Sequence, residues 1–573
     1  MATPSSVVDP VRLQLLRSAL TSIVDEMCVA VVRTSRSSAV KEQMDFTTAL
    51  CDAEGRVVAQ GVCIALHLGT LPDVVRTVLD HFPAMAEGDV AIVNDPYSGG
   101  THLPDIYMIR PIYLEGTRFG YAVVDMHHVD VGGRVAGSVA PDSTEIFEEG
   151  VRIPPILYRR GGELNESLIA VLAANVRLPE LVLGDLEAQE NACRLAEDRL
   201  RDVVARHGAE TVREYMTHLL DYAERMARAE IAAMPDGEYF FVDHLDDDGI
   251  GNEPVRIEVR VHIHGDELTV DFEGSSPQVR GAINVATPMT RSACFCCVRA
   301  VMRSNIPDNE GFCLPIKVLA PPGSIVNPSF PAAVGARGAT VHRLCDAVFG
   351  ALAQAVPTRV MAADEGGSSN IGVGGRREDG TPFVTVDFMY GNWGGRSTAD
   401  GIDGASNLFS NMANIPVEVM ESELPIEVLR YGFVPNSGGP GRYRGGLAMT
   451  REIRLLDGDA TLTLRSDRQR FRPYGLAGGE PGAPSGSTLE TAGGERLELK
   501  TKFTRPIHAG ETFRHVQAGA GGYGDPRLRD PERVATDVRD EKIDVEHARQ
   551  AYGVVVDATT FSVDVDATAR LRA

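Results

Sequence analysis

Short segments within the first 130 residues bring together side chains of the types that bind divalent metal ions. They contribute Asp45 in MDFTT, His102 and Asp105 in GGTHLPD, and the pair His127 and His128 in DMHHVDVGG. A mixed set of imidazole and carboxylate ligands suits zinc, manganese or ferrous iron better than calcium or magnesium. We therefore take these residues as candidates for one divalent metal site.

Each of these motifs is weak when it is considered alone. A His-x-x-Asp pattern is common on protein surfaces, although Gly99 and Gly100 permit a tight loop here and Pro104 stiffens the approach to the aspartate. Adjacent residues of a strand point to opposite faces, so only one histidine of the His-His pair would face a given site. The other would be an orienting or substrate-contacting group. A structural alternative, in which backbone hydrogen bonds satisfy both histidines, stays open at this point.

Hydrophobic periodicity predicts the elements that must position these residues. Apolar residues recur every three and four positions over 9–35, which is typical of an amphipathic helix that begins at Asp9 and Pro10. Short apolar runs broken by Gly, Pro and Asp over 45–155 indicate strands and functional loops. The other predicted elements are two or three helices over 168–234, an antiparallel meander after Gly237 with a hairpin at His264, Gly265 and Asp266, helices over 281–303 and 339–364, and mostly sheet over 415–520.

A chain of 573 residues is expected to form several packed units. The pattern predicts an α+β protein, a multi-domain mixed α/β fold with a helical segment in the middle and a β-rich C-terminal half. No fixed-period repeat marks a boundary between the units. The expected regions are an N-terminal metal-site region over 1–165, a helical segment over 166–236, a central α+β region over 237–410 and a β-rich C-terminal region over 411–573.

The formal net charge of −24 argues against nucleic acid as a partner, because phosphate binding needs a basic surface. No stretch approaches the roughly 20 apolar residues of a membrane-spanning helix. The N-terminus lacks the basic-then-apolar order of a signal peptide. We therefore expect a cytoplasmic protein without a membrane partner.

The nine cysteines predict no disulfide framework, because they are odd in number and scattered. The cluster CFCC at 294–297 lacks the second spaced pair of a zinc site, so we expect buried, reduced thiols there. The acidic set Glu418, Glu421 and Glu423 is more typical of an exposed charged face than of a cation site.

The glycine-dense stretches do not supply a nucleotide site. The candidates are NDPYSGG at 94–100 and GAGGYGDP at 519–526. A P-loop needs Gly-x-x-x-x-Gly-Lys-Ser/Thr and a dinucleotide fold needs Gly-x-Gly-x-x-Gly between a strand and a helix, and the chain has neither in the right context. The nucleophile elbow Gly-x-Ser-x-Gly is also missing, which argues against a serine hydrolase. The chain is therefore not expected to hydrolyse ATP by itself.

Beyond the candidate ligands, the chain carries an ordered series of longer motifs. They begin with MDFTTALCDAEGRVVAQ, HLGTLPDVV, GDVAIVNDPYSGGTHLPDIYMIRPI and HHVDVGG, and they continue through DFEGSSPQVRGAIN and PPGSIVNPSFPAAVG to LRSDRQRFRPYGLAGGEPGAP. Together they resemble the hydantoinase B/oxoprolinase family. That family includes N-methylhydantoinase B subunits, the B-like half of 5-oxoprolinase, a lactamase for larger rings, and the large subunits of acetone and acetophenone carboxylases.

The resemblance also implies the residues of the site. Its ion would be one divalent zinc, manganese or iron ion. His128 and Asp130 would act beside it as catalytic groups that orient ligands or handle protons. The implied metal ligands are Asp45, His102, Asp105 and His127.

Mechanistically, the resemblance implies a division of labour between two subunits. A hydantoinase A-type partner would use ATP and magnesium to phosphorylate a cyclic amide such as a hydantoin, oxoproline or lactam, and this chain would open the activated ring. The metal would activate water or polarise the electrophilic carbon. The assembly would be a hetero-oligomer with a homodimer core. The alternatives are a subunit of an ATP-dependent ketone carboxylase and a non-catalytic scaffold that only stabilises its partner.

Overall fold

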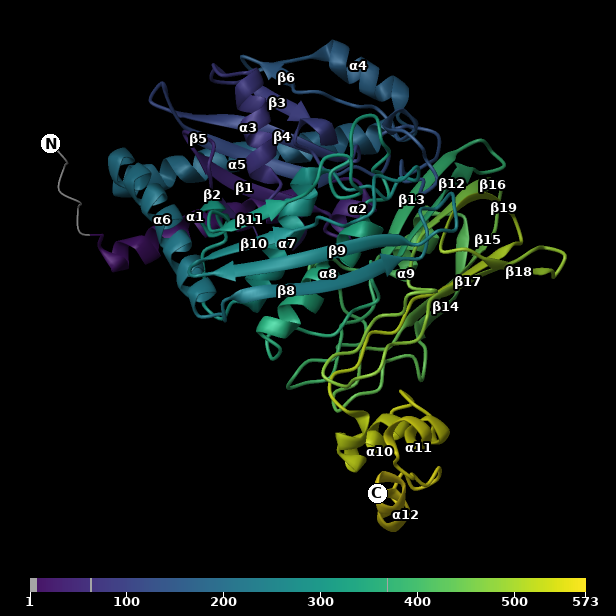
Figure 1. Cartoon of the computed structure of the whole chain (residues 1–573). Helices are drawn as coiled ribbons and strands as arrows, with labels where there is room; N and C mark the ends of the chain where they lie inside the picture. Colours follow the sequence, from purple (N-terminus) through teal and green to yellow (C-terminus); the bar gives the residue numbers. More distant parts are fainter. Residues whose placement is uncertain (1–7, 62–63, 368) are drawn as a thin grey trace.

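The structure is a computed structural model that describes residues 8–61, 64–367 and 369–573. Within these residues the strands form one seven-stranded sheet, two four-stranded sheets and one five-stranded sheet. Figure 1 shows helices packed against the N-terminal and middle sheets, and a small helical lobe at the C-terminal end of the chain. The mixed α/β fold that the sequence predicts is therefore confirmed.

The N-terminal part of the chain forms a sheet with helices on both faces. Its strands are β1 (Phe46–Asp52), β2 (Val57–Gln60), β3 (Val90–Val93), β4 (Asp105–Leu114), β5 (Thr117–His127), β6 (Ile156–Arg160) and β7 (Glu163–Leu164), in the order β2-β1-β5-β4-β3-β6-β7. Its helices are α1 (Pro10–Thr34), α2 (Ser38–Lys41), α3 (Leu71–His81) and α5 (Pro179–His207). Ile106 and Met108 of β4 pack in the core that contains α1 and α5, whereas Tyr107 and Ile109 pack in the core that contains α3. The central strands are buried on both faces, which explains their nearly continuous apolar sequence.

Helix α1 begins where the sequence predicts a helix. The Asp9 side chain accepts a hydrogen bond from the N–H of Val11, and Pro10 occupies the first turn. The helices predicted over 168–234 are also confirmed. They are α4 (Glu166–Asn175), α5 and α6 (Ala209–Ala232).

The middle of the chain forms a second sheet that is covered by two helices. Its strands are β8 (Gly237–Leu245), β9 (Val255–His264), β10 (Glu267–Asp271) and β11 (Ile316–Leu319), in the order β11-β10-β9-β8, and its helices are α7 (Thr287–Val301) and α8 (Gly338–Ala355). The predicted hairpin is confirmed, since β9 and β10 pair antiparallel with His264 opposite Glu267. Helix α8 ends before the predicted position 364, because Val356 precedes Pro357 and a residue before proline disfavours the helical conformation.

Two further sheets and four short helices make up the rest of the described chain. The four-stranded sheet has the order β13-β12-β16-β19, and the five-stranded sheet has the order β14-β15-β20-β17-β18. The last helices form the small lobe in Figure 1, so the end of the region predicted as β-rich is helical. The boundaries predicted between regions remain predictions. The elements are β12 (Ser369–Arg376), β13 (Pro382–Met389), α9 (Val417–Glu423), β14 (Ile426–Phe433), β15 (Met449–Leu455), β16 (Asp459–Arg465), β17 (Gly486–Glu490), β18 (Arg496–Leu499), β19 (Lys502–His508), β20 (Thr512–Val516), α10 (Pro531–Arg539), α11 (Val545–Tyr552) and α12 (Val565–Arg572).

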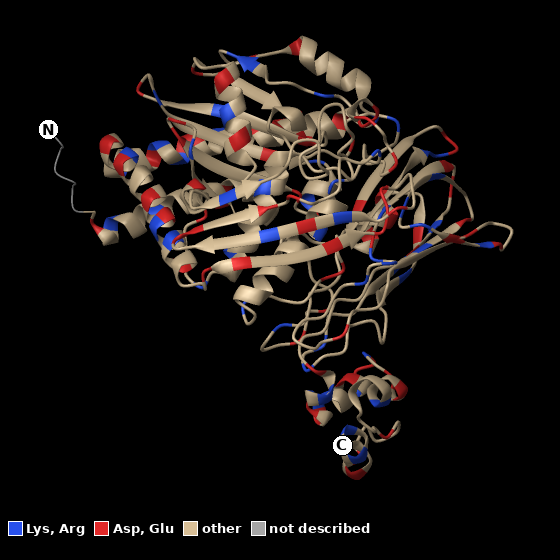
Figure 2. Cartoon of the chain, viewed as in Figure 1, with Lys and Arg blue, Asp and Glu red and all other residues tan. Residues whose placement is uncertain are grey.

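Charged residues of both signs are spread over the helices and strands of the molecule (Figure 2). Glu418, Glu421 and Glu423 are exposed on α9, as predicted. The described cysteines are free, and those of the 294–297 cluster are buried, as predicted, whereas Cys63 lies outside the described residues. Among the described helices, none combines the length and the apolar character that crossing a membrane requires.

Candidate metal centre

The candidate ligands lie at one end of three neighbouring strands. Asp45 directly precedes β1, Asp105 is the first residue of β4 and His127 is the last residue of β5. Strand β5 lies between the other two, so Asp105 is opposite His127, and the N–H of His127 donates to the carbonyl of Asp45 at 3.0 Å. His102 lies in the turn before β4, where its carbonyl accepts the N–H of Asp105 at 3.1 Å. The strand pairing therefore brings residues from three separate segments to one place.

The side chains of these residues approach one another closely. His102 Nε2 lies 3.0 Å from Asp105 Oδ1 and 3.2 Å from His127 Nδ1. His127 Nδ1 lies 3.1 Å from Asp105 Oδ1 and 3.7 Å from Asp45 Oδ2. All four residues are buried. The structure thus brings together the two imidazoles and two carboxylates that the sequence analysis names as ligands.

The surroundings of His102 determine which of its ring nitrogens carries a lone pair. Nδ1 lies 3.1 Å from the carbonyl oxygen of Gly335, which can only accept a hydrogen bond, so Nδ1 carries the proton. Nε2 is then an acceptor atom that faces a carboxylate oxygen of Asp105. Burial lowers the pKa of His102 to about 3, so the ring is neutral at physiological pH. A cation between these two acceptor atoms would relieve their repulsion, and the donor set fits zinc, manganese or iron.

The two carboxylates are both ionised at neutral pH. Arg337 Nη2 donates to Asp105 Oδ2 at 2.6 Å, and the Thr101 hydroxyl donates to the same oxygen. Although burial opposes ionisation, the guanidinium of Arg337 helps to hold the pKa of Asp105 well below its usual range. Burial raises the pKa of Asp45 to about 6. Both carboxylates are therefore available as ligands above this pH.

The cluster lines a small cavity of about 60 Å³, which residues from the second half of the chain close. Arg337 and His342 come from the N-terminal end of α8, Phe388 lies on β13, and Arg465 ends β16. Burial lowers the pKa of His342 to about 3, so this imidazole is also neutral. The sequence analysis missed these residues, because no local pattern connects them with ligands so far away along the chain.

His67 is another cavity residue that the sequence analysis missed. Its Nδ1 lies 3.0 Å from Asp125 Oδ2 and 3.0 Å from Thr47 Oγ1. The motif HLGTLPDVV, which begins at this histidine, contained the signal for it. His67, Asp105 and Asp125 form a second possible ligand group, whose atoms lie within 4.8 Å of one another. The group around His102 is more compact, so we place the candidate metal there.

His128 and Asp130 are not among the described residues that line the cavity. His128 Nε2 lies 3.2 Å from Gln189 Oε1 on α5. Asp130 accepts hydrogen bonds from the backbone N–H of Arg177 at 2.7 Å and from its guanidinium at 2.8 Å. The structure therefore does not bring these two residues to the cluster, and the catalytic roles predicted for them remain predictions.

Comparison with known proteins assigns the chain to a family. The family model for hydantoinase B/oxoprolinase matches residues 9–526. The chain belongs to the hydantoinase B/oxoprolinase family. It is 32% identical to a putative B subunit of a D-/L-hydantoinase from Pseudomonas sp. (strain NS671), and the alignment covers 99% of this chain and 98% of the relative.

Solved structures share the fold of the whole chain. The crystal structure of ATP-dependent caprolactamase from Pseudomonas jessenii matches with a TM-score of 0.92 and 31% identity, over 99% of this chain and 100% of the other. A nucleotide-free structure of acetone carboxylase matches with a TM-score of 0.92 over 98% of this chain and 82% of the other. Its identity of 20% shows a common fold only. The family resemblance seen in the sequence motifs is thus confirmed.

Proposed function

We propose that this chain is the metal-dependent B subunit of an ATP-dependent amidohydrolase that opens a cyclic amide, namely a hydantoin, oxoproline or lactam. The observation that carries the proposal is the position of His102 Nε2, the ring nitrogen with the free lone pair. This atom lies 3.0 Å from Asp105 Oδ1 and 3.2 Å from His127 Nδ1. The similar proteins named as a hydantoinase B subunit and an ATP-dependent caprolactamase support the substrate class.

The chain prepares the four ligand residues for a cation. A zinc, manganese or iron ion held there would supply an activated water or a polarised carbonyl at neutral pH. The Gly335 carbonyl fixes the tautomer of His102, and Arg337 keeps Asp105 ionised through its hydrogen bond. Burial excludes bulk water, which strengthens the electrostatic interactions of these groups. The neutral ring of His342, which lines the cavity, adds a polar group but no positive charge.

We assign the use of ATP to a partner. The sequence lacks the P-loop pattern, and its Gly-x-Gly-x-x-Gly spacing at 519–524 does not open an α-helix. The relative from Pseudomonas sp. is named as a B subunit. A hydantoinase A-type subunit would bind ATP and magnesium and phosphorylate the amide oxygen, which makes the ring carbon electrophilic. This chain would then open the ring. A hetero-oligomer with a homodimer core and a cytoplasmic location belong to the same proposal.

A second candidate function is that of a subunit of an ATP-dependent ketone carboxylase. The match to acetone carboxylase, with a TM-score of 0.92, favours it as the alternative. Substrate trials with and without bicarbonate separate the two functions. Ring opening without bicarbonate supports the hydrolase, whereas consumption of a ketone that requires bicarbonate supports the carboxylase.

The test of the metal site combines metal content with activity. The parent chain, His102→Ala and the control His508→Ala are analysed for bound metal and, with the A-type partner, for ATP-dependent ring opening. His508 is an exposed histidine that pairs with Asp459. We expect about one ion per subunit in the parent and the control, and almost none in His102→Ala, with loss of activity. Equal metal content in all three proteins would refute the proposed metal site.

A non-catalytic scaffold is the remaining alternative, and Asp105→Ala tests it. The variant is assembled with the A-type partner, and the intact complex is confirmed by gel filtration before activity is measured. Loss of ring opening in an intact complex argues against a scaffold. Full activity would instead support the scaffold and contradict the metal centre.

A further inference from the structure

The metal cavity is too small to hold a whole cyclic amide. Its volume of about 60 Å³ corresponds to about two water molecules at ~30 Å³ each. A ring with its carbonyl groups and substituents is several times larger. A substrate that reacts at the candidate metal must therefore lie mainly in an adjoining space.

A chamber of about 360 Å³ adjoins the metal cavity and has the size of a small-molecule site. Ile64 lines both spaces, so the two lie next to each other at this residue. Ala65, Ala300 and Asp308 also line the chamber and are exposed to solvent. The chamber therefore connects the surface of the molecule with the neighbourhood of the metal centre.

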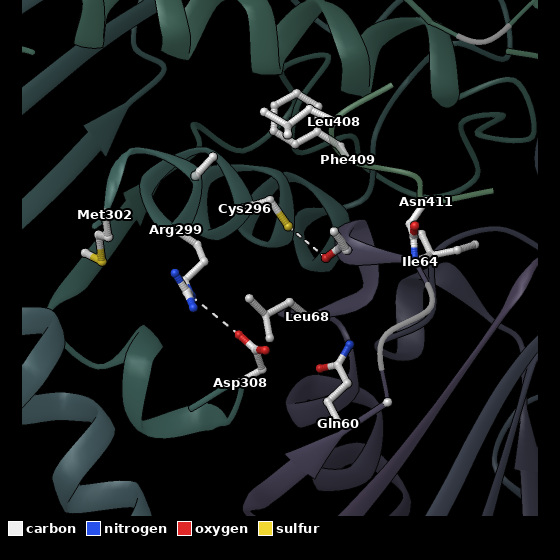
Figure 3. A pocket seen from close by; sticks show the side chains of 13 residues that line it. Gln60, Ile64, Leu68, Cys296, Arg299, Met302, Asp308, Leu408, Phe409 and Asn411 are labelled. Atoms are coloured by element: carbon white, nitrogen blue, oxygen red, sulfur yellow. Dashed lines mark hydrogen bonds and ion pairs between the residues drawn. The ribbon is translucent and has the colours of Figure 1, made fainter. Parts of the chain in front are cut away.

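Two segments form the wall between the chamber and the metal cavity. In the first, Ala65 lines the chamber and the next residue, Leu66, lines the metal cavity. In the second, Phe409 lines the chamber and Ser410 lines the metal cavity. The N–H of Leu66 donates to the carbonyl of Phe409 at 3.0 Å, which ties the segments together. Figure 3 shows Phe409 and Ile64 among the side chains that line the chamber.

The lining of the chamber suits an uncharged, largely apolar group. Leu68, Leu408 and Phe409 supply apolar surface around it (Figure 3). Its two charged side chains neutralise each other, since Arg299 Nε lies 3.4 Å from Asp308 Oδ1. The described residues that line the chamber therefore carry no net charge that would attract an ionic substrate group.

The thiol in the chamber is not a nucleophile. Cys296 Sγ donates to the carbonyl of Ala65 at 2.7 Å, the contact drawn in Figure 3. Burial raises the pKa of this thiol well above its usual value, so it is protonated. The chamber therefore has the character of a binding space, and the reactive groups lie beyond its wall.

We propose that the chamber binds the body of the substrate, an uncharged cyclic amide with an apolar ring or ring substituent, while the amide group enters the metal cavity past Ile64. This inference rests on the proposed function and names its substrate class. A neutral lactam such as ε-caprolactam is preferred to 5-oxoproline, whose carboxylate would lose its hydration without gaining an unpaired cation.

The first experiment measures occupancy of the chamber without turnover. The complex with the A-type partner is prepared as Ala300→Cys. The reaction of its thiol with methyl methanethiosulfonate, which forms a mixed disulfide and releases methanesulfinate, is timed with and without ε-caprolactam. Because Ala300 lines the chamber and is exposed, bound ε-caprolactam slows the reaction several-fold, and 5-oxoproline slows it less. The parent complex corrects for native cysteines. An unchanged rate with ε-caprolactam refutes substrate binding in the chamber. Equal protection by 5-oxoproline refutes the preference for an uncharged substrate.

The second experiment fills the chamber. In Leu408→Trp the KM for ε-caprolactam rises about tenfold, whereas the bound metal and kcat stay near the parent values. Ala229→Trp is the matched control, because Ala229 lines a separate cavity of about 330 Å³. Parent-like KM in Leu408→Trp, or the same rise in the control, overturns the proposal.

The two measurements separate the chamber from the proposed function. Protection of Ala300→Cys by ε-caprolactam without ring opening by the parent complex refutes the amidohydrolase and supports the chamber. Ring opening without protection, and with unchanged KM in Leu408→Trp, supports the amidohydrolase but refutes substrate binding in the chamber. Absence of both protection and ring opening overturns both.

Discussion

Glu149 gives the protein a pH dependence of stability that one substitution should remove. Its carboxyl group is buried, and Oε1 accepts the N–H groups of Val334 at 2.9 Å and Gly335 at 2.6 Å. Oε2 is buried and has no hydrogen-bond partner among the described residues. Burial raises the pKa of Glu149 from 4.5 to about 8. The fold therefore favours the protonated form of this side chain.

The sign of the effect follows from the two protonation states. Between pH 4.5 and about 8 the folded protein keeps this proton, whereas the unfolded chain has released it. The free energy of unfolding therefore falls as the pH rises through this range. The difference between about 8 and 4.5, at ~1.4 kcal/mol for each pH unit, gives about 5 kcal/mol as the largest loss. Glu149→Gln keeps the accepting oxygen but cannot ionise, so the variant escapes this loss.

The assay is urea unfolding of the parent and Glu149→Gln from pH 5 to 8.5, in the presence of a chelator. We expect similar stability at pH 5 and a more stable variant at pH 8. Other buried carboxyl groups, such as Asp346 with its pKa raised to about 8 by burial, contribute equally to both proteins and cancel in the difference. Glu145→Gln, which changes an exposed carboxyl four residues away, is the control and should follow the parent. Parallel curves for the parent and Glu149→Gln would refute the reasoning.

Two other measurements test the ligand cluster and the packing. Because burial raises the pKa of Asp45 to about 6, protons should compete with the metal, and the ion retained after gel filtration should fall between pH 7 and pH 5. Retention that is constant over this range would contradict a ligand role for Asp45. Gly311→Ala should lower the free energy of unfolding in urea by about 1–3 kcal/mol, because a Cβ would lie 2.1 Å from the carbonyl oxygen of Leu220. An unchanged midpoint of urea unfolding would show that the backbone around Leu220 shifts without a loss of stability.

The four candidate ligands could be predicted from the sequence because each lies in a short motif beside a strand. Strand and loop signals over 45–155 predicted the kind of region in which they lie, whereas the antiparallel pairing seen in the structure determines their proximity. The alternation of strand side chains also predicted that only one histidine of the pair faces the cavity. In the structure His127 lines the cavity and His128 contacts Gln189 instead.

The residues that support the ligands could not be predicted, because their contacts are made by the tertiary fold. Gly335 acts through its backbone carbonyl, so its side chain carries no signal of the hydrogen bond to His102. Strand β12 is a similar case, since its sequence SNIGVGGR alternates two β-branched residues, Ile371 and Val373, with glycines that weaken the signal of a central strand. A Cβ on Gly375 would lie 2.1 Å from the carbonyl oxygen of Asp459, so glycine is required by the approach of the neighbouring strand.

The segment before α8 makes the middle layer of the protein part of the candidate metal centre. The carbonyl of Gly335 accepts a hydrogen bond from His102, and Arg337 donates one to Asp105. The carboxyl group of Glu149 in turn accepts the N–H of Gly335. The candidate ligands on the N-terminal sheet are thus oriented from a different layer, and a change in the packing of these layers would move the lone pairs that the proposed cation needs. Since His342 follows on the first turns of α8 and lines the same cavity, one segment positions both the ligands and a polar group toward the substrate. Substitutions in this segment should therefore alter metal affinity and substrate turnover together, although none of its side chains is a proposed ligand.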